Sequence, residues 1–145
     1  MQKEGLNMSE NILEVKDLKV HFPIHGGLFL GKVGEVKAVD GVSFSVKAGE
    51  TLGMVGESGC GKPTVGKALI NLAPVTSGEV LFAGADGKVS NIAGLNHKAM
   101  RPFRSRMQMV FQDPYSSLNP RMSVEAIVSE PLDIHMPGMS AKEKR

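Results

Sequence analysis

The stretch GESGCGKPT, residues 56–64, has the spacing of a phosphate-binding loop, G-x-x-x-x-G-K-[ST], but Pro63 stands where a hydroxyl residue is usual. The five apolar-rich residues before it, TLGMV at 51–55, are typical of a strand buried on both faces. Apolar side chains then recur at helical spacing at Val65, Ala68, Leu69 and Leu72. This order of strand, glycine loop and helix favours a phosphate loop over an ordinary glycine-rich turn.

The chemistry of such a loop depends on its backbone and on one lysine. Gly56, Gly59 and Gly61 let the backbone N–H groups approach an anion closely, and the N-terminus of the following helix adds partial positive charge. Lys62 supplies the full charge that reaches the β- and γ-phosphates of a nucleotide. We therefore expect ATP with Mg²⁺ as the ligand.

Pro63 damages this loop in two ways. It offers no hydroxyl to Mg²⁺ and no N–H to a phosphate oxygen, and a hydrogen bond to a charged group is worth about 1.5–3 kcal/mol. Thr64 follows one position late and cannot simply replace the missing hydroxyl. Proline is tolerated in a first helical turn, although it restricts the residue before it, Lys62. We expect weakened ATP binding and badly impaired Mg²⁺-dependent hydrolysis.

The bulk properties are those of one globular domain. The chain has 145 residues, 41% of them hydrophobic and 22% charged, with a net charge of +2 and a single cysteine, Cys60. So small a charge gives no case for nucleic acid, and one cysteine excludes an internal disulfide. No segment approaches the roughly 20 apolar residues of a membrane span. We expect a cytoplasmic protein that reaches a membrane only through a partner.

Other elements follow from periodicity and turn residues. Alternation predicts strands at 12–22, 42–47 and 78–84, with an irregular loop over 22–34 and turns at 48–50 and at Asp86-Gly87. A short basic helix is expected over 97–106 and a buried strand over 107–111. Ser123 is expected to cap a helix that ends before Pro131. The capping-box spacing of Ser140 and Glu143 predicts the start of another helix.

These elements predict an α/β fold with a parallel P-loop sheet core and an antiparallel β subdomain. We expect residues 1–10 to be disordered, residues 11–122 to form the nucleotide-binding core, and residues 123–145 to begin a helical subdomain. A chain of this kind should leave apolar faces uncovered, so we expect poor solubility.

Two further stretches carry a family resemblance. Together with the loop, AVDGVSFSVKAGETLGMV at 38–55 and MVFQDPYSSLNPRMSV at 109–124 resemble the nucleotide-binding subunits of ABC transporters. The resemblance is closest to the F-type subunit of oligopeptide and dipeptide importers. It runs from about residue 11 to the end and matches only the N-terminal half of such a subunit.

The resemblance implies roles for particular residues. It makes the following the ATP-binding Walker A loop: Gly56, Glu57, Ser58, Gly59, Cys60, Gly61, Lys62 and Thr64. Gln112 resembles the Q-loop glutamine, which contacts Mg²⁺ and the attacking water and whose loop touches the membrane subunit. Lys62 and Gln112 are therefore the candidate catalytic residues, and Gln112 is the candidate metal ligand. The residue that contacts adenine should fall near Val33, with Phe22 or Phe29 as alternatives.

The resemblance also implies a function: an ATP-binding subunit that couples ATP binding and hydrolysis to peptide import. Its expected partners are a second ATP-binding subunit, transmembrane permease subunits and, indirectly, a substrate-binding protein, with no nucleic acid. The LSGGQ-like signature, the Walker B strand and the switch histidine do not occur here. A non-hydrolytic nucleotide-binding or docking remnant, and a small P-loop kinase that uses Asp113, are the alternatives. The basic residues at 97–106 are interpreted as a solvated helix face.

Overall fold

The computed structural model describes residues 11–26, 31–84, 86–113, 117–140 and 142–144. The expected disorder of residues 1–10 lies outside this range. The chain divides into two compact units, Met1–Met107 and Gln108–Arg145, and each is described by itself. None of the helices in the described residues is both long and apolar enough to cross a bilayer.

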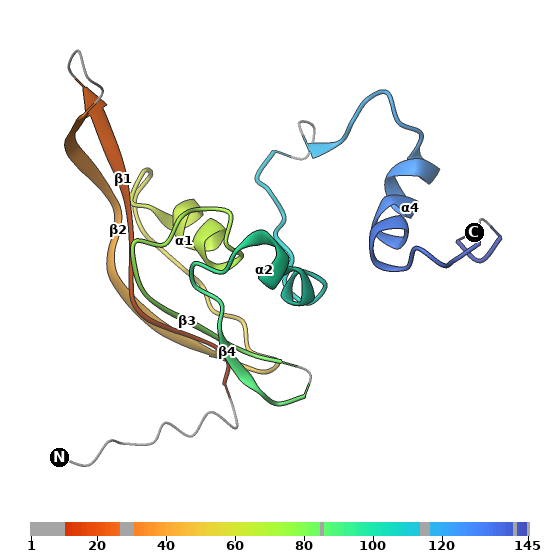
Figure 1. The fold of residues 1–145 in the computed structure, drawn as a ribbon, viewed down its shortest axis with the longest axis horizontal. Helices are drawn as coiled ribbons and strands as arrows, with labels where there is room; N and C mark the ends of the chain where they lie inside the picture. Colours follow the sequence, from red (N-terminus) through yellow and green to blue (C-terminus); the bar gives the residue numbers. More distant parts are fainter. Residues whose placement is uncertain (1–10, 27–30, 85, 114–116, 141, 145) are drawn as a thin grey trace. The chain divides into compact units, whose positions relative to one another are not determined.

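The first unit is built on a four-stranded antiparallel sheet in the order β2-β1-β3-β4 (Figure 1). Its strands are β1 (Asn11–Gly26), β2 (Gly31–Lys47), β3 (Ser77–Ala83) and β4 (Val89–Asn91). The strands predicted at 12–22, 42–47 and 78–84 are therefore confirmed. The turns are confirmed too, because Glu50 N–H donates to the Lys47 carbonyl at 3.1 Å and Gly87 N–H to the Gly84 carbonyl at 3.1 Å.

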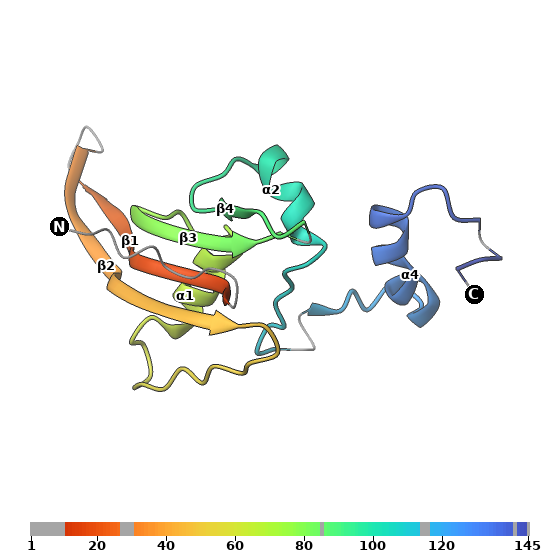
Figure 2. The ribbon, with the colours of Figure 1, turned by 90° about the horizontal axis from the view of Figure 1, so that it is seen from below.

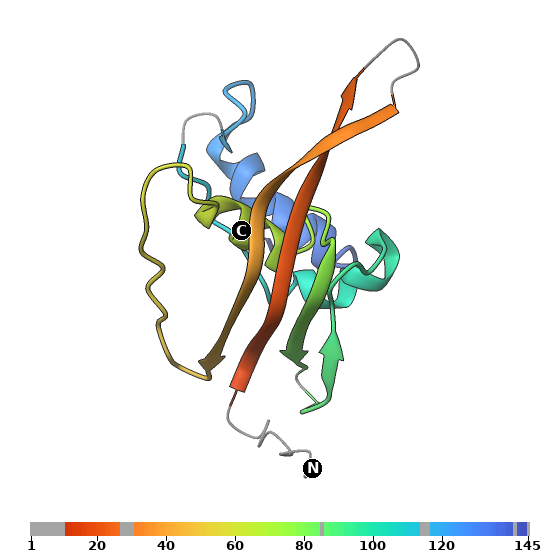
Figure 3. The same cartoon turned by 90° about the vertical axis from the view of Figure 1, so that its left-hand side faces the viewer.

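The irregular loop predicted over 22–34 is wrong for its described parts. Strands β1 and β2 form one long hairpin whose pairing continues through Phe22↔Val36 and Ile24↔Gly34 to Gly26↔Gly31 (Figure 3). Paired backbone N–H and C=O groups keep the strands regular there despite the glycines, since each pair satisfies two polar groups that would otherwise need water. Register shifts, including one between Ile24 and His25, absorb the irregular sequence.

Helix α1 (Lys62–Leu69) packs on one face of this sheet and completes the core (Figures 1 and 2). The most buried side chains come from the strands, from α1 and from the segments around α2 (His97–Arg104): Val15, Leu18, Val20, Val39, Val65, Ala68, Val80, Phe82, Ile92 and Met100. The helical stripe predicted after the loop is right for Val65 and Ala68. It is wrong for Leu72, which lies beyond the helix and is 54% exposed.

The chain turns away after α1 because Asn71 adopts a left-handed conformation, φ 57°. Asparagine tolerates this conformation better than most residues. The Asn71 side-chain amide donates to the Leu95 carbonyl, which ties the end of α1 to the approach of α2. In α2 the Asn96 side chain accepts from Ala99 N–H at 2.9 Å, so the predicted basic helix is confirmed, although it ends at Arg104.

The two strands predicted at 51–55 and 107–111 do not form. Residues 51–55 are exposed, with Val55 at 96%, and Val110 in the second segment is also 96% exposed. A strand buried on both faces needs hydrogen-bonding neighbours and covering layers. Within the described parts of the chain no strand pairs with either segment, so the sheet there is entirely antiparallel rather than the expected parallel core.

The second unit contains α4 (Val124–His135). Ser123 caps it as predicted, since its hydroxyl oxygen accepts from Ala126 N–H at 3.2 Å. The predicted stop before Pro131 is wrong. The helix continues through this proline, whose ring already has a helical φ, although the proline removes one N–H and its ring crowds the carbonyl one turn earlier. Residues 142 and 143 form a turn rather than the predicted helix, although the Glu143 carboxylate accepts from Ser140 N–H at 2.8 Å.

Candidate phosphate-binding site

Gly61 fixes the geometry of the glycine loop at the start of α1. It is the N-cap residue, with φ 95°, and its carbonyl accepts the first helical hydrogen bond from Val65 N–H at 3.0 Å. A Cβ placed on Gly61 would lie 2.2 Å from the carbonyl oxygen of Ala38 in β2. Both the positive φ and this close approach require glycine. The sequence predicted that Gly61 lets the loop backbone approach an anion; its close approach to β2 is a separate constraint.

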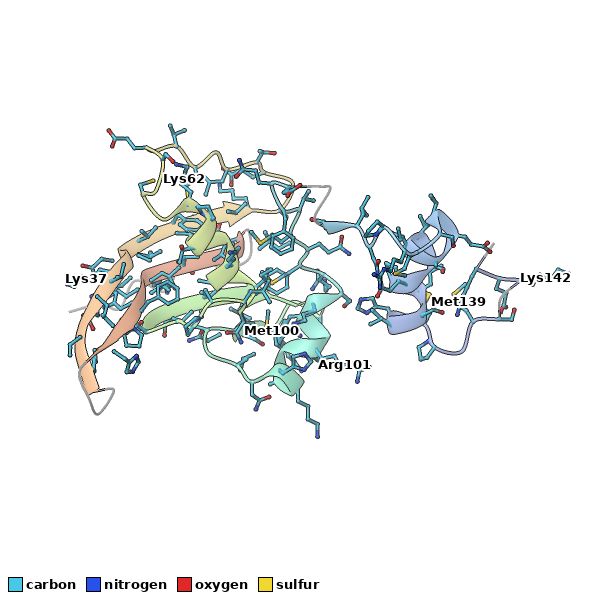
Figure 4. The ribbon with its side chains drawn as sticks, turned by 90° about the horizontal axis from the view of Figure 1, so that it is seen from above. Lys37, Lys62, Met100, Arg101, Met139 and Lys142 are labelled. Carbon is cyan, nitrogen blue, oxygen red and sulfur yellow. The ribbon has the colours of Figure 1, made fainter. Side chains whose placement is uncertain are left out.

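Lys62 turns its side chain back into the loop (Figure 4). Its Nζ donates to the carbonyl oxygens of Gly56 at 2.6 Å and Glu57 at 2.7 Å, and it lies 3.5 Å from the Cys60 sulfur. The loop thus wraps a positive charge, and the first turn of α1 follows with N–H groups that have no partner inside the helix. Such an arrangement attracts a phosphate group.

Pro63 lies exposed in the first turn of α1, and the helix forms around it. The expectation that the fold tolerates this proline is confirmed. Lys62 is helical, so the proline does not force the preceding residue out of the helix. The chemical deficit is unchanged, because the position directly after the lysine has neither N–H nor hydroxyl. Thr64 is half-buried one position further on.

The loop therefore fits a phosphate better than a magnesium ion. The tight approach at Gly61 and the enclosed Lys62 suit an anion. Among the described residues no group of three or more His, Cys, Asp or Glu side chains is arranged to hold a metal. A P-loop metal takes its protein ligand from the hydroxyl that Pro63 lacks.

The remaining candidate residues lie apart from the loop in the sequence. Val33 is 66% exposed in β2, close to Gly26 of β1, and Phe22 is 37% exposed in β1 opposite Val36. Phe29 lies outside the described residues. Gln112 belongs to the second unit, where it is exposed in a bend rather than at the end of a strand.

Sequence reasoning missed a polar cluster on the hairpin. The His21 ring lies between two carboxylates of β2, with Nδ1 3.4 Å from Glu35 and Nε2 3.1 Å from Asp40. Hydrogen bonds from His21 and then Lys37 hold the pKa of Asp40 below its ordinary value. The hydrogen bond and charge of Lys32 do the same to the pKa of Glu35. Only the strand register, His21↔Lys37, brings these residues together.

Comparison with known protein families settles the kinship of the chain. The profile of the family described as ABC transporter matches residues 39–144. The chain belongs to this family. The match includes the glycine loop, α1 and Gln112, and it confirms the resemblance inferred from the sequence.

Individual ABC relatives agree. The oligopeptide transport ATP-binding protein AppF of Bacillus subtilis is 55% identical over 126 residues, covering 87% of this chain and 37% of the relative. OppF of Bacillus subtilis is 49% identical, over 94% of this chain and 41% of the relative. OppF of Escherichia coli is 46% identical, over 92% of this chain and 39% of the relative. The chain thus spans about two fifths of the length of these relatives.

A solved structure supports the fold. The ATP-binding cassette MJ0796, determined as a dimer in a post-hydrolysis state bound to ADP and Pi, superposes with a TM-score of 0.70 at 23% identity. The match covers 91% of this chain and 52% of that one. The fold is therefore that of the N-terminal part of an ABC nucleotide-binding domain, as the sequence predicted, although within the described residues only the antiparallel sheet of that prediction forms.

Proposed function

We propose that the chain contributes the nucleotide-binding loop of an ABC-type oligopeptide or dipeptide importer, whose ATP binding and hydrolysis drive transport. The observation that carries this proposal is the enclosed ammonium group of Lys62 in a loop closed by Gly61. The names of the relatives supply the substrate class, since AppF and OppF are oligopeptide transport proteins.

Each loop residue has a role in this proposal. The backbone of residues 56–61 surrounds the phosphates, Lys62 exchanges its bonds to the Gly56 and Glu57 carbonyls for phosphate oxygens, and Thr64 lies in the first turn beneath them. Mg²⁺, when bound, neutralises charge on the phosphates. We assign Gln112 to the metal and the attacking water. Adenine contact falls to Val33, with Phe22 or Phe29 as the alternatives.

The proposed assembly follows the family. Residues 11–122 form the nucleotide-binding core and residues 123–145 begin a helical subdomain. A second ATP-binding subunit completes the nucleotide site, and transmembrane permease subunits hold the pair at the inner face of the cell membrane. A substrate-binding protein acts indirectly, by delivering peptide.

Nucleotide binding by the purified chain tests the role of the loop. We expect a fluorescent ATP analogue to bind, and Lys62→Ala to weaken its binding by about tenfold to a hundredfold, as for loss of bonds to a charged group. Lys67→Ala is the matched control, because Lys67 is an exposed lysine on the same helix outside the loop. Equal affinities for the parent chain and Lys62→Ala would contradict the proposal.

A second function, nucleotide binding without hydrolysis, is favoured by Pro63. The two functions differ in turnover, so ATP hydrolysis is to be measured with the permease subunits and the second ATP-binding subunit present. If the chain with Pro63 is silent and Pro63→Ser hydrolyses ATP, the parent chain is a non-hydrolytic binder. If both hydrolyse ATP at the same rate, the transporter ATPase function stands and the proline is without effect.

A further inference from the structure

The charge of the chain is concentrated in one segment. Residues 87–112 contain five lysines and arginines and no aspartate or glutamate, so the rest of the chain carries twelve basic and fifteen acidic residues. The net charge of +2 therefore hides a basic region within an otherwise acidic protein. The region centres on α2.

Helix α2 separates its apolar and basic side chains. Met100 is fully buried, and the Phe103 ring packs edge-on against the Phe82 ring with 6.2 Å between the ring centroids. Both side chains therefore pack inside the first unit. Lys98 and Arg101 are exposed and Arg104 is half-buried. These three residues follow each other at i and i+3 spacing, and we call them the basic face.

Among the described residues, no acidic side chain forms an ion pair with Lys98, Arg101 or Arg104 of the basic face. Like charges at i and i+3 repel each other, and the positive end of the helix dipole disfavours Lys98 in the first turn, whereas Arg101 and Arg104 lie in the last turn, where the dipole favours positive charge. Arg106 differs, since it donates to the Ala83 carbonyl at 3.2 Å and lies over the Phe82 ring.

The basic face is separate from the phosphate loop. Figure 4 shows Lys62 and Arg101 at opposite edges of the first unit, with Met100 between α2 and the sheet. Its charges are therefore not part of the proposed nucleotide site. Three basic side chains that form no ion pair among the described residues and serve neither the core nor the loop fit an external anionic partner.

We propose that the basic face binds the phosphate headgroups of anionic phospholipids. The outer side of the helix offers charge beside only small exposed residues, Ala99 and Pro102, because Met100 is buried and Phe103 packs against Phe82. A peptide partner would need an apolar anchor in a pocket, whereas a headgroup layer needs only basic side chains near its surface. This inference goes beyond the proposed function, and it does not depend on nucleotide binding.

Flotation with lipid vesicles tests the inference, and aggregated protein does not float. The full chain should float with vesicles of equal parts phosphatidylcholine and phosphatidylglycerol, and not with phosphatidylcholine alone. Binding should fall as salt rises. Each basic residue at such a surface contributes about a fivefold change in partitioning. The variant Lys98→Gln/Arg101→Gln/Arg104→Gln should therefore bind about a hundredfold more weakly.

The control variant Lys32→Gln/Lys37→Gln/Lys67→Gln removes the same charge from exposed lysines elsewhere. It should float like the parent chain, and circular dichroism should show both variants folded. Equal losses in the two variants, or no flotation of the parent, would overturn the inference. So would displacement by inorganic phosphate beyond that by chloride at equal ionic strength, which would indicate a discrete phosphate site. Binding of labelled polyglutamate in place of vesicles would assign the face to an acidic protein partner instead.

Discussion

Replacing Pro63 can separate the effect of the missing backbone N–H from the effect of the missing hydroxyl. Pro63 is exposed in the first turn of α1, where the fold does not require a proline ring. Pro63→Ala restores the backbone N–H alone, and Pro63→Ser restores both the N–H and the hydroxyl. Because α1 already begins at Lys62 with Gly61 as its N-cap, neither variant has to rebuild the loop.

The size of each step follows from the bond restored. One N–H donated to a phosphate oxygen is worth about 1.5–3 kcal/mol, so Pro63→Ala should bind ATP about tenfold to a hundredfold more tightly, with or without Mg²⁺. Pro63→Ser should add a further gain only when Mg²⁺ is present. Both variants lose some stability, about 0.4–1 kcal/mol, because proline restricts the unfolded chain.

Titration of a fluorescent ATP analogue, with Mg²⁺ and with a chelator, measures both steps. Urea unfolding of the same samples checks that the variants remain folded. If Pro63→Ala and Pro63→Ser bind no better than the parent chain under either condition, the first-turn N–H does not contact phosphate. If Pro63→Ser binds the analogue more tightly than Pro63→Ala by the same factor with the chelator as with Mg²⁺, the serine hydroxyl does not act through the metal.

Three further predictions concern the loop, a cap and the hairpin. Gly61→Ala should abolish nucleotide binding and lower the free energy of unfolding, because its Cβ would lie 2.2 Å from a carbonyl oxygen of β2; Gly59→Ala, with φ 83° and open space, should cost only about 1–2 kcal/mol in urea unfolding. Ser123→Ala should lose about 1 kcal/mol of α4 stability, seen as reduced helical signal in circular dichroism. The His21 hydrogen bond lowers the pKa of Asp40 below its ordinary 3.8, so its stabilisation is present above that value and is lost as the pH falls through the depressed pKa. The melting temperatures of the parent chain and Asp40→Asn should therefore differ at neutral pH and converge in strong acid; a constant difference would contradict the ion-pair account.

The sequence predicted best what short-range rules determine. The loop, the start of α1 and the Ser123 cap depend on residues within one or two turns, and all three form as expected. The strands predicted at 51–55 and 107–111 failed because a strand depends on neighbours that local pattern does not supply. The end of α1 was misjudged because Asn71, rather than the apolar stripe, stops the helix.

The candidate site also combines features that the local sequence predicted with features that it did not. The enclosure of Lys62 agrees with the loop motif, whereas the roles of Gln112 and Val33 stay predictions that came from family spacing. The cluster of His21, Glu35 and Asp40 was invisible in the sequence, because the register of two long strands creates it.

The close approach of Gly61 to the Ala38 carbonyl means that the antiparallel sheet supports the loop. Ala38 precedes the core residue Val39 in β2, and a Cβ on Gly61 would also lie 3.7 Å from Val39 Cγ2, so the loop rests on a strand that is anchored in the core. The extended segment 51–55 leading into the loop is exposed and supplies no such support. A shift of β2 within the hairpin should therefore displace Gly61 and change the conformation of the phosphate loop. A mechanical load on β2, rather than on segment 51–55, should then change the affinity of the proposed nucleotide site.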